Sequence, residues 1–366
     1  MEPESADDFN DYGNPAAAPE RPLPRVAGSR TALRGAIKSE PADFEVEEIP
    51  AYHPNGTGEH LFLWIEKENV AAEQLTRHVA RTLEVPVGDV GVAGLKDKRA
   101  ITRQYLSVPA RVGDRIDRLE TPQIRVLSAK QHQNKLRTGH LQGNRFSILV
   151  RGAEATALAE AEASAEQIRK SGFPNYFGEQ RYGVDRETLE LGRHLLSGTK
   201  SPRDIPHSRR KFLLRFALSA AQSALFDQAL AARIDDGLFS RVLVGDVMQV
   251  VASGGVFVVE DADVEQVRFD VGELSITGPM YGPKMRAPIG VPAEREAAIL
   301  ESNGIAPDAF MRYSNLTSGT RRPYAVRPAD LDVSAEAEGL RFRFTLPPGT
   351  YATTLLREFL RDEGEQ

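Results

Sequence analysis

One acidic side chain in this sequence stands among basic ones in a way that could do chemistry. Asp97 lies in the segment Gly91–Thr102, with Lys96, Lys98 and Arg99 as its charged neighbours. Nearby positive charge stabilises the ionised form of a carboxyl group, and a carboxylate held in this way can act as a nucleophile or as an ion-pair partner. Charged turns of this kind are also common on surfaces, so the segment alone leaves a catalytic and a surface interpretation open.

The composition is that of a globular chain long enough for two domains. Of its 366 residues 41% are apolar and 27% are charged, which is typical of folded proteins. Cysteine is absent, which excludes disulfides and thiolate chemistry and fits a reducing compartment. The seven histidines lack ligand spacing, so we expect no metal site. Neither a membrane-span pattern nor an export signal is recognisable, and we expect a cytoplasmic protein.

The charge is unevenly distributed along the chain. Residues 1–30 hold six acids against three arginines, are rich in Pro and Ala, and are predicted to be a disordered acidic tail. Lys130–Arg151 contains five basic residues and no acid, and Lys200–Arg215 contains six basic residues and one acid. Such local patches are the electrostatic footprint of phosphate binding, although a solvated surface can look the same.

Hydrophobic periodicity predicts strands and helices that do not alternate as βαβ units, so the fold class is α+β. The alternation of Asn144–Val150 places Asn144, Phe146 and Ile148 on one face of a strand. Strands are predicted at Glu45–Ile49, Leu61–Ile65, Gln104–Val108, Asn144–Val150, Leu331–Val333 and Leu340–Leu346, with a hairpin over Val242–Glu260. Helices are predicted at Ala71–Leu83, Ala155–Lys170, Arg186–Leu196, Ser208–Ile234 and Ala293–Ser302.

Several segments taken together resemble the TruD family of tRNA pseudouridine synthases. Gly94–Gln104, which contains Asp97, is similar to the catalytic signature of that family. The other matching segments are Lys38–Glu48, Gly143–Phe146, Pro174–Gly183, Ser219–Phe226 and Leu346–Glu358. They occur in the family's order and extend over nearly all of the chain that we expect to fold.

The resemblance implies a catalytic domain with the pseudouridine synthase fold, whose sheet is mixed and largely antiparallel. It also implies an α+β TRUD domain inserted into that domain. We expect the catalytic domain to be discontinuous, formed by residues 31–171 and 327–366, with the TRUD domain at 172–326. The turn chemistry of Gly172-Phe-Pro supports the first boundary.

The resemblance also assigns roles to individual residues. It makes Asp97 the catalytic aspartate and Lys38 the basic residue that keeps it ionised. Phe146 would stack on the target base, and each aromatic could instead be packed in the core. Substrate contacts are implied at Phe44, Asn144, Phe146 and Tyr351.

The implied reaction breaks the C1′–N1 glycosidic bond of uridine, turns the uracil and rejoins it through C5, without metal or cofactor. A carboxylate can attack C1′ or C6, or stabilise a cationic sugar and abstract a proton, and the sequence leaves these routes open. The target base must leave its stack to be reached.

The partner implied by the resemblance is tRNA, and the position is uridine 13 in the D arm. The basic stretches would then grip the phosphates of a folded RNA, and nothing in the sequence requires more than a monomer. The candidates for phosphate contacts are Lys96, Lys98, Arg209, Arg210, Lys211, Arg321 and Arg322.

Two other classes of protein fit this sequence less well. An RNA-binding protein or RNA chaperone without turnover would have no need of Asp97, whose charge repels phosphate. An aspartate-dependent hydrolase would need a second carboxylate or a histidine in a recognisable motif, and the sequence shows none.

Overall fold

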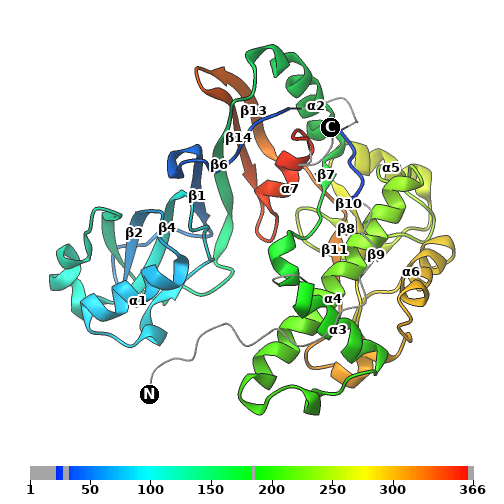
Figure 1. The fold of residues 1–366 in the computed structure, drawn as a ribbon, viewed down its shortest axis with the longest axis horizontal. Coiled ribbons are helices and arrows are strands. Elements are labelled where there is room, and N and C mark those ends of the chain that lie inside the picture. Colours follow the sequence, from blue (N-terminus) through cyan, green and yellow to red (C-terminus); the bar gives the residue numbers. More distant parts are fainter. Residues whose placement is uncertain (1–21, 28–32, 184–185, 362–366) are drawn as a thin grey trace.

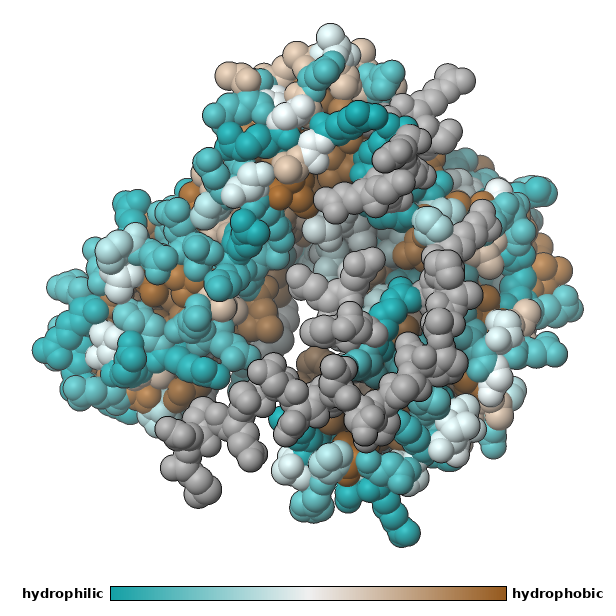
Figure 2. Space-filling model, in the orientation of Figure 1, coloured by the Kyte–Doolittle hydropathy of each residue, from teal (hydrophilic) through white to brown (hydrophobic). Residues whose placement is uncertain are grey.

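A computed structural model of the chain describes residues 22–27, 33–183 and 186–361. Its elements form two lobes (Figure 1): a sheet lobe, and a second lobe made of residues 175–324. The surface is hollowed between the two lobes (Figure 2). Among the helices of the described residues, none has the length and apolarity needed to cross a bilayer.

The sheet lobe is built on one eight-stranded sheet in the order β13-β14-β6-β1-β4-β2-β5, with β3 beside β4. Only β1 and β4 run parallel, so the sheet is mixed and largely antiparallel, as the resemblance implied. Its strands are β1 (Phe44–Pro50), β2 (His60–Glu68), β3 (Gly91–Val92), β4 (Ile101–Pro109), β5 (Ile124–His132), β6 (Leu141–Arg151), β13 (Ala329–Glu336) and β14 (Gly339–Leu346).

The two faces of this sheet differ because side chains alternate along each strand. On one face, Leu63 and Ile65 of β2 pack against Leu75 of helix α1 (Ala72–Leu83). Helices α2 (Leu158–Ser171) and α7 (Ala352–Arg357) share a core with β6 and β14. The other face carries ion pairs such as that of Arg103 with Glu66, at 2.8 Å. The apolar face is therefore the one on which a buried site can be built.

The second lobe combines helices with a four-stranded antiparallel sheet in the order β11-β10-β8-β9. The helices are α3 (Glu187–Ser197), α4 (His207–Asp235), α5 (Ala262–Asp270) and α6 (Val291–Ser302). The strands are β8 (Val247–Val250), β9 (Val256–Val258), β10 (Leu274–Met280) and β11 (Thr320–Pro323). The predicted helix Ser208–Ile234 is confirmed as α4, and the predicted hairpin as β8–β9.

Short 3₁₀ turns join these elements. Those in the described residues are η1 (Pro41–Asp43), η2 (Val87–Asp89), η3 (Ala110–Leu119), η4 (Ala155–Ala157), η5 (Glu179–Tyr182), η7 (Pro202–Asp204) and η8 (Ala309–Tyr313).

The chain leaves the sheet lobe for the second lobe and returns to it through two paired strands. Strand β7 (Phe173–Pro174) pairs antiparallel with β12 (Ala325–Val326). Gly172 precedes β7 with a φ of +77°, and a Cβ there would lie 2.9 Å from the carbonyl oxygen of Val326. Glycine is required at this position because the conformation and the close approach both exclude a side chain.

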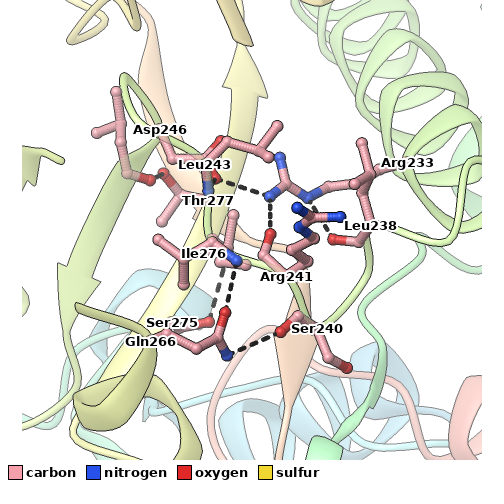
Figure 3. Close-up of polar contacts among 12 residues, drawn as sticks. Arg233, Leu238, Ser240, Arg241, Leu243, Asp246, Gln266, Ser275, Ile276 and Thr277 are labelled. Carbon is pink, nitrogen blue, oxygen red and sulfur yellow. Dashed lines mark hydrogen bonds and ion pairs between the residues drawn. The ribbon is translucent and has the colours of Figure 1, made fainter. Parts of the chain in front are cut away.

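A buried ion pair anchors α4 within the second lobe (Figure 3). The guanidinium of Arg233 donates to both carboxylate oxygens of Asp246, at 2.9 and 2.7 Å. It also donates to the carbonyl oxygens of Leu238 and Arg241, at 3.0 and 2.7 Å. Removing two charges from water is costly, and this cost is offset only where the remaining donors find partners, as they do here.

Three elements of this lobe were not predicted: α5, β10 and β11. In β10, Gly278 and Pro279 are residues typical of turns, yet the strand is almost entirely buried. A Cβ on Gly278 would lie 2.1 Å from the ring of Tyr324. The glycine therefore marks a close packing contact within a strand. Edge strand β5 was also missed, because most of its side chains are exposed and hydrophobic alternation is weak.

The predicted tail is wrong for residues 22–27. The backbone N–H groups of Val26 and Ala27 donate to Oε2 of Glu358, at 2.8 and 3.0 Å, and Ala27 is buried. Leu23 packs against the core of the second lobe. The acidic, Pro-rich composition of residues 1–30 hid a short apolar segment, residues 22–27, which packs against the folded protein. Residues 1–21 and 28–30 lie outside the described residues.

Candidate active site

Asp97 lies in the loop between β3 and β4, where its side chain is 41% exposed. Nζ of Lys38 donates to its Oδ1 at 2.7 Å. Within the described part of the chain this is the one hydrogen bond of the carboxylate, so Oδ2 is left for another group. A carboxylate that is held by one oxygen and accessible through the other is suited to act on a bound substrate.

Lys38 reaches Asp97 from far along the sequence and is itself closely held. Its Nζ lies 4.1 Å from the ring centroid of Phe44, a cation–π contact. Its φ of +59° is unusual for a residue other than glycine. Such backbone strain costs on the order of 1 kcal/mol or more and is concentrated at functional sites.

The charges around Asp97 differ from those that the sequence suggested. Lys96 turns away from Asp97, and its Nζ donates to Oε2 of Glu48 at 2.7 Å. The side chains of this pair are 4% and 0% exposed, respectively. A phosphate cannot reach such a buried ammonium group, so the predicted phosphate contact of Lys96 is wrong. Lys98 and Arg99 are exposed, and the described contacts include no hydrogen bond from either to Asp97.

Lys67 was not found by sequence reasoning. It is fully buried at the end of β2, and its Nζ donates to the carbonyl oxygens of Asp97 and Val70, both at 2.7 Å. Burial lowers the pKa of Lys67 to about 8, against the opposing effect of the nearby Asp97. Lys67 therefore holds the main chain of Asp97, whereas Lys38 holds its side chain. The available signal was a lysine that continues the inward alternation of Leu63 and Ile65.

One of the predicted aromatics, Phe44, lies against Lys38, and another, Phe146, packs against Phe44. Phe44 begins β1, and its ring meets that of Phe146 at 6.2 Å and 77°. Phe146 also stacks on Phe344, at 5.3 Å. Both Phe44 and Phe146 are almost completely buried, so their rings form an apolar floor beside the Lys38–Asp97 pair.

Asn144 lies on the same face of β6 as Phe146, nearer the start of the strand. It is opposite Glu48 of β1 in the strand register, which places it next to the buried Lys96–Glu48 pair. Its Oδ1 is buried and has no hydrogen-bond partner among the described residues. A buried polar atom without a partner costs about 1–3 kcal/mol. Oδ1 is therefore ready to accept a hydrogen bond.

Tyr351 is held by the second lobe, just before α7 begins. Its ring centroid lies 6.4 Å from that of Phe177, and a Cβ on Gly178 would be 3.4 Å from its Cδ1. The described contacts thus join Tyr351 to the Asn175–Gly178 segment and do not join it to Asp97.

Two arginines predicted to contact phosphates have structural partners instead. Arg321 is buried and donates to both carboxylate oxygens of Glu296, at 3.0 and 2.7 Å. Arg322 stacks over Phe177 at 4.1 Å and donates to Oδ1 of Asn175 at 2.7 Å. Burial lowers the pKa of Arg322 to about 10. The predicted phosphate contacts of Arg321 and Arg322 are therefore wrong, because both guanidinium groups already bind other residues of the protein.

The remaining basic candidates lie near the start of α4. Arg209 and Lys211 are exposed, whereas Arg210 is half-buried and donates to the carbonyl oxygen of Ile205, at 3.2 Å through Nε. In the described residues no cluster of three or more histidine, aspartate or glutamate side chains could hold a metal ion.

Comparison with known proteins gives concordant matches along nearly the whole chain. The family model described as tRNA pseudouridine synthase D (TruD) matches residues 27–202 and 206–359. A tRNA pseudouridine synthase D of Anaeromyxobacter dehalogenans strain 2CP-1 is 41% identical over 343 residues, covering 94% of this chain and 97% of the relative. A Thermus thermophilus protein of the same description is 40% identical over 346 residues, with 94% of each chain covered.

A solved structure has the same fold. The crystal structure described as tRNA pseudouridine synthase D from Methanosarcina mazei matches with a TM-score of 0.75 and 24% identity, and covers 92% of this chain and 96% of that one. The fold is therefore that of a pseudouridine synthase. The chain belongs to the TruD family of tRNA pseudouridine synthases, as the sequence resemblance indicated. It is accordingly an isomerase that forms pseudouridine in tRNA.

Proposed function

We propose that this enzyme isomerises uridine 13 in the D arm of tRNA, with Asp97 as its catalytic carboxylate. The observation that carries the proposal is the way in which Asp97 is held. Lys38 binds one carboxylate oxygen at 2.7 Å and Lys67 binds the carbonyl oxygen of the same residue at 2.7 Å. The position within tRNA rests on the sequence resemblance.

The reaction breaks the C1′–N1 bond, forms a C1′–C5 bond, and moves the proton of C5 away as N1 gains one. The unbonded oxygen of Asp97 can attack the sugar or the base, or abstract a proton. Lys38 binds one oxygen of this carboxylate at 2.7 Å and so fixes the orientation of the group.

The uridine would leave its stack and bind against the apolar floor of Phe44 and Phe146. Asn144 offers a buried acceptor without a partner, which can receive a hydrogen bond from the N–H of uracil or from a ribose hydroxyl group. Tyr351 would approach the substrate from the side of the second lobe, so the pocket needs both lobes to be complete.

The same proposal assigns a role to each of the two domains. A catalytic domain of residues 31–171 and 327–366 carries the chemistry, and an inserted domain of residues 172–326 helps to bind the tRNA. Exposed Lys98, Arg209 and Lys211, together with Arg210, neutralise phosphates. The enzyme acts as a monomer in the cytoplasm.

The test is pseudouridine formation on unmodified tRNA transcripts, mapped to single nucleotides, for the wild type and for Asp97→Asn. Asp114→Asn is the matched control, because Asp114 is an exposed aspartate of the same lobe. We expect pseudouridine at position 13 with the wild type and with Asp114→Asn, and none with Asp97→Asn. Signal at another position would discard uridine 13, and modification by Asp97→Asn would discard the assigned carboxylate. Tight tRNA binding by the wild type without any pseudouridine would favour an RNA chaperone.

A further inference from the structure

Two phenylalanine rings are stacked on the outer surface of α4. Phe212 and Phe216 lie one helical turn apart, with their ring centroids at 4.4 Å and an angle of 29° between the rings. Their relative exposures are 62% and 51%. Large aromatic side chains usually contribute to cores, and a stacked pair that faces water points to a ligand.

The surroundings of this pair are positively charged. The first ten residues of α4 are exposed or half-buried, and the buried part of the helix begins at Ala217. Lys211 and Arg215, beside the two rings in sequence, are both exposed. From Lys200 to Phe226 the only acid in the sequence is Asp204, whose carboxylate accepts the N–H of Ser201 at 2.7 Å.

The pair is not needed to attach α4 to its lobe. Leu213 and Leu214 pack against the core of the second lobe, and Leu218 is fully buried in it. Two rings one turn apart stabilise a helix only slightly. Their exposure therefore calls for a partner that offers flat apolar surfaces together with negative charge.

A second exposed apolar stripe on the same lobe shows the contrast. Helix α5 exposes Val264 and Val267, at 55% and 65%, but this stripe is aliphatic and has the acids Asp263 and Glu265 beside it. Of these two surfaces, the one on α4 combines aromatic faces with cations, which is the combination that binds unpaired nucleotides.

We propose that Phe212 and Phe216 form a stacking platform for unpaired bases of the tRNA substrate, with Lys211 and Arg215 holding the adjacent phosphates. This inference rests on the proposed function in its choice of tRNA, and it adds a base-binding site on the second lobe. The platform binds RNA by stacking, so it tolerates any base and adds affinity without adding sequence preference.

The experiment measures tRNA affinity for the double variant Phe212→Ala/Phe216→Ala. Stacking on one aromatic is worth enough to give roughly a tenfold loss of affinity. The slope of log affinity against log salt should stay unchanged, because no phosphate contact is removed, whereas Lys211→Ala should lower it by about one. Phe212→Trp should retain affinity and Phe212→Leu should not. The control Val264→Ala/Val267→Ala removes a similar exposed apolar pair and should bind as the wild type.

Three results would overturn the platform. The first is wild-type affinity of the double variant; the second is an equal loss on a blunt RNA duplex that has no unpaired base. The third is a concentration-dependent dimer that only the double variant lacks, which would make the surface a contact between copies. If tRNA binding depends on the two rings while uridine 13 stays unmodified by the wild type, the proposed reaction site fails and the platform stands.

Discussion

The Lys38–Asp97 pair of the sheet lobe and the Arg233–Asp246 pair of the second lobe have the same chemistry in opposite settings. Each has an N–O distance of 2.7 Å. The side chains of the first pair are 21% and 41% exposed, and those of the second are 5% and 3% exposed. Arg233 binds both oxygens of its carboxylate, whereas Lys38 binds one oxygen of Asp97.

This difference distinguishes an ion pair that can bind a substrate from one that only stabilises the fold. A fully satisfied and buried ion pair has no capacity left for a ligand, and losing one partner strands a charge in the core. A half-exposed pair with a vacant oxygen costs little to break and can still bond to a substrate. We therefore expect changes at Asp97 to affect the reaction, and changes at Asp246 to affect folding.

The largest effect is expected for Asp97→Asn. The amide cannot act as a nucleophile or base, so the single-turnover rate of pseudouridine formation should fall at least about a thousandfold. The free energy of unfolding should change by less than about 0.5 kcal/mol, since the side chain is 41% exposed and its ion pair is not buried. Measuring both quantities on the same preparation checks the comparison, which would fail if stability fell along with the rate.

Next in size is Asp246→Ala, which leaves the guanidinium of Arg233 buried without its carboxylate. We expect a loss of about 3–5 kcal/mol in the free energy of unfolding, measured by urea titration. Asp236→Ala is the matched control, because Asp236 pairs with Arg295 at 2.6 Å but is 54% exposed. Its cost should be about 0–1 kcal/mol. Equal losses of stability in the two variants would show that burial does not determine the cost of breaking these ion pairs.

Lys38→Met should have an intermediate effect. The carboxylate of Asp97 would remain but lose its orientation, so the rate should fall about tenfold to a hundredfold. Affinity for tRNA should hold, because Lys38 contacts Asp97 and Phe44 within the site. Single-turnover rates and equilibrium binding separate these two readouts. A loss confined to binding would make Lys38 a phosphate contact.

The smallest effect is a pH dependence at Asp227, which is buried on α4 and accepts hydrogen bonds from the Phe177 N–H and the Tyr182 hydroxyl. Burial raises the pKa of Asp227 to about 7. Between about pH 4 and pH 7 the folded protein holds a proton that the unfolded chain has lost, so this contribution to stability falls as pH rises. Asp227→Asn should therefore raise Tm by a few degrees at pH 8 and hardly change it at pH 5. Thermal unfolding at both pH values measures this, and a larger gain at pH 5 would contradict it.

Much of this structure could be predicted from local patterns. The period of apolar residues predicted α1 and α4 to within about two residues. Helix α1 buries one stripe of a regular spiral, whereas α4 is buried on nearly every side from Ala217 onward. The alternation on β6 placed Asn144 and Phe146 on a shared face. Strand β10 escaped prediction, since Gly278 looks like a turn until Tyr324 is packed against it.

The candidate site likewise has features that the sequence indicates and features that only the folded chain sets. Sequence alone determined that the chain belongs with tRNA pseudouridine synthases and that Asp97 is the carboxylate to examine, because motif residues lie close together along the chain. The resemblance had also named Lys38 as the basic partner of that carboxylate, and tertiary structure decided what the other nearby lysines do. Lys96, its neighbour in sequence, is turned into the core by Glu48, whereas Lys38 and Lys67 are brought to Asp97 by the pairing of β1 and β2 with β4. Charge interactions act over a few ångströms of space, and only the folded chain sets those distances.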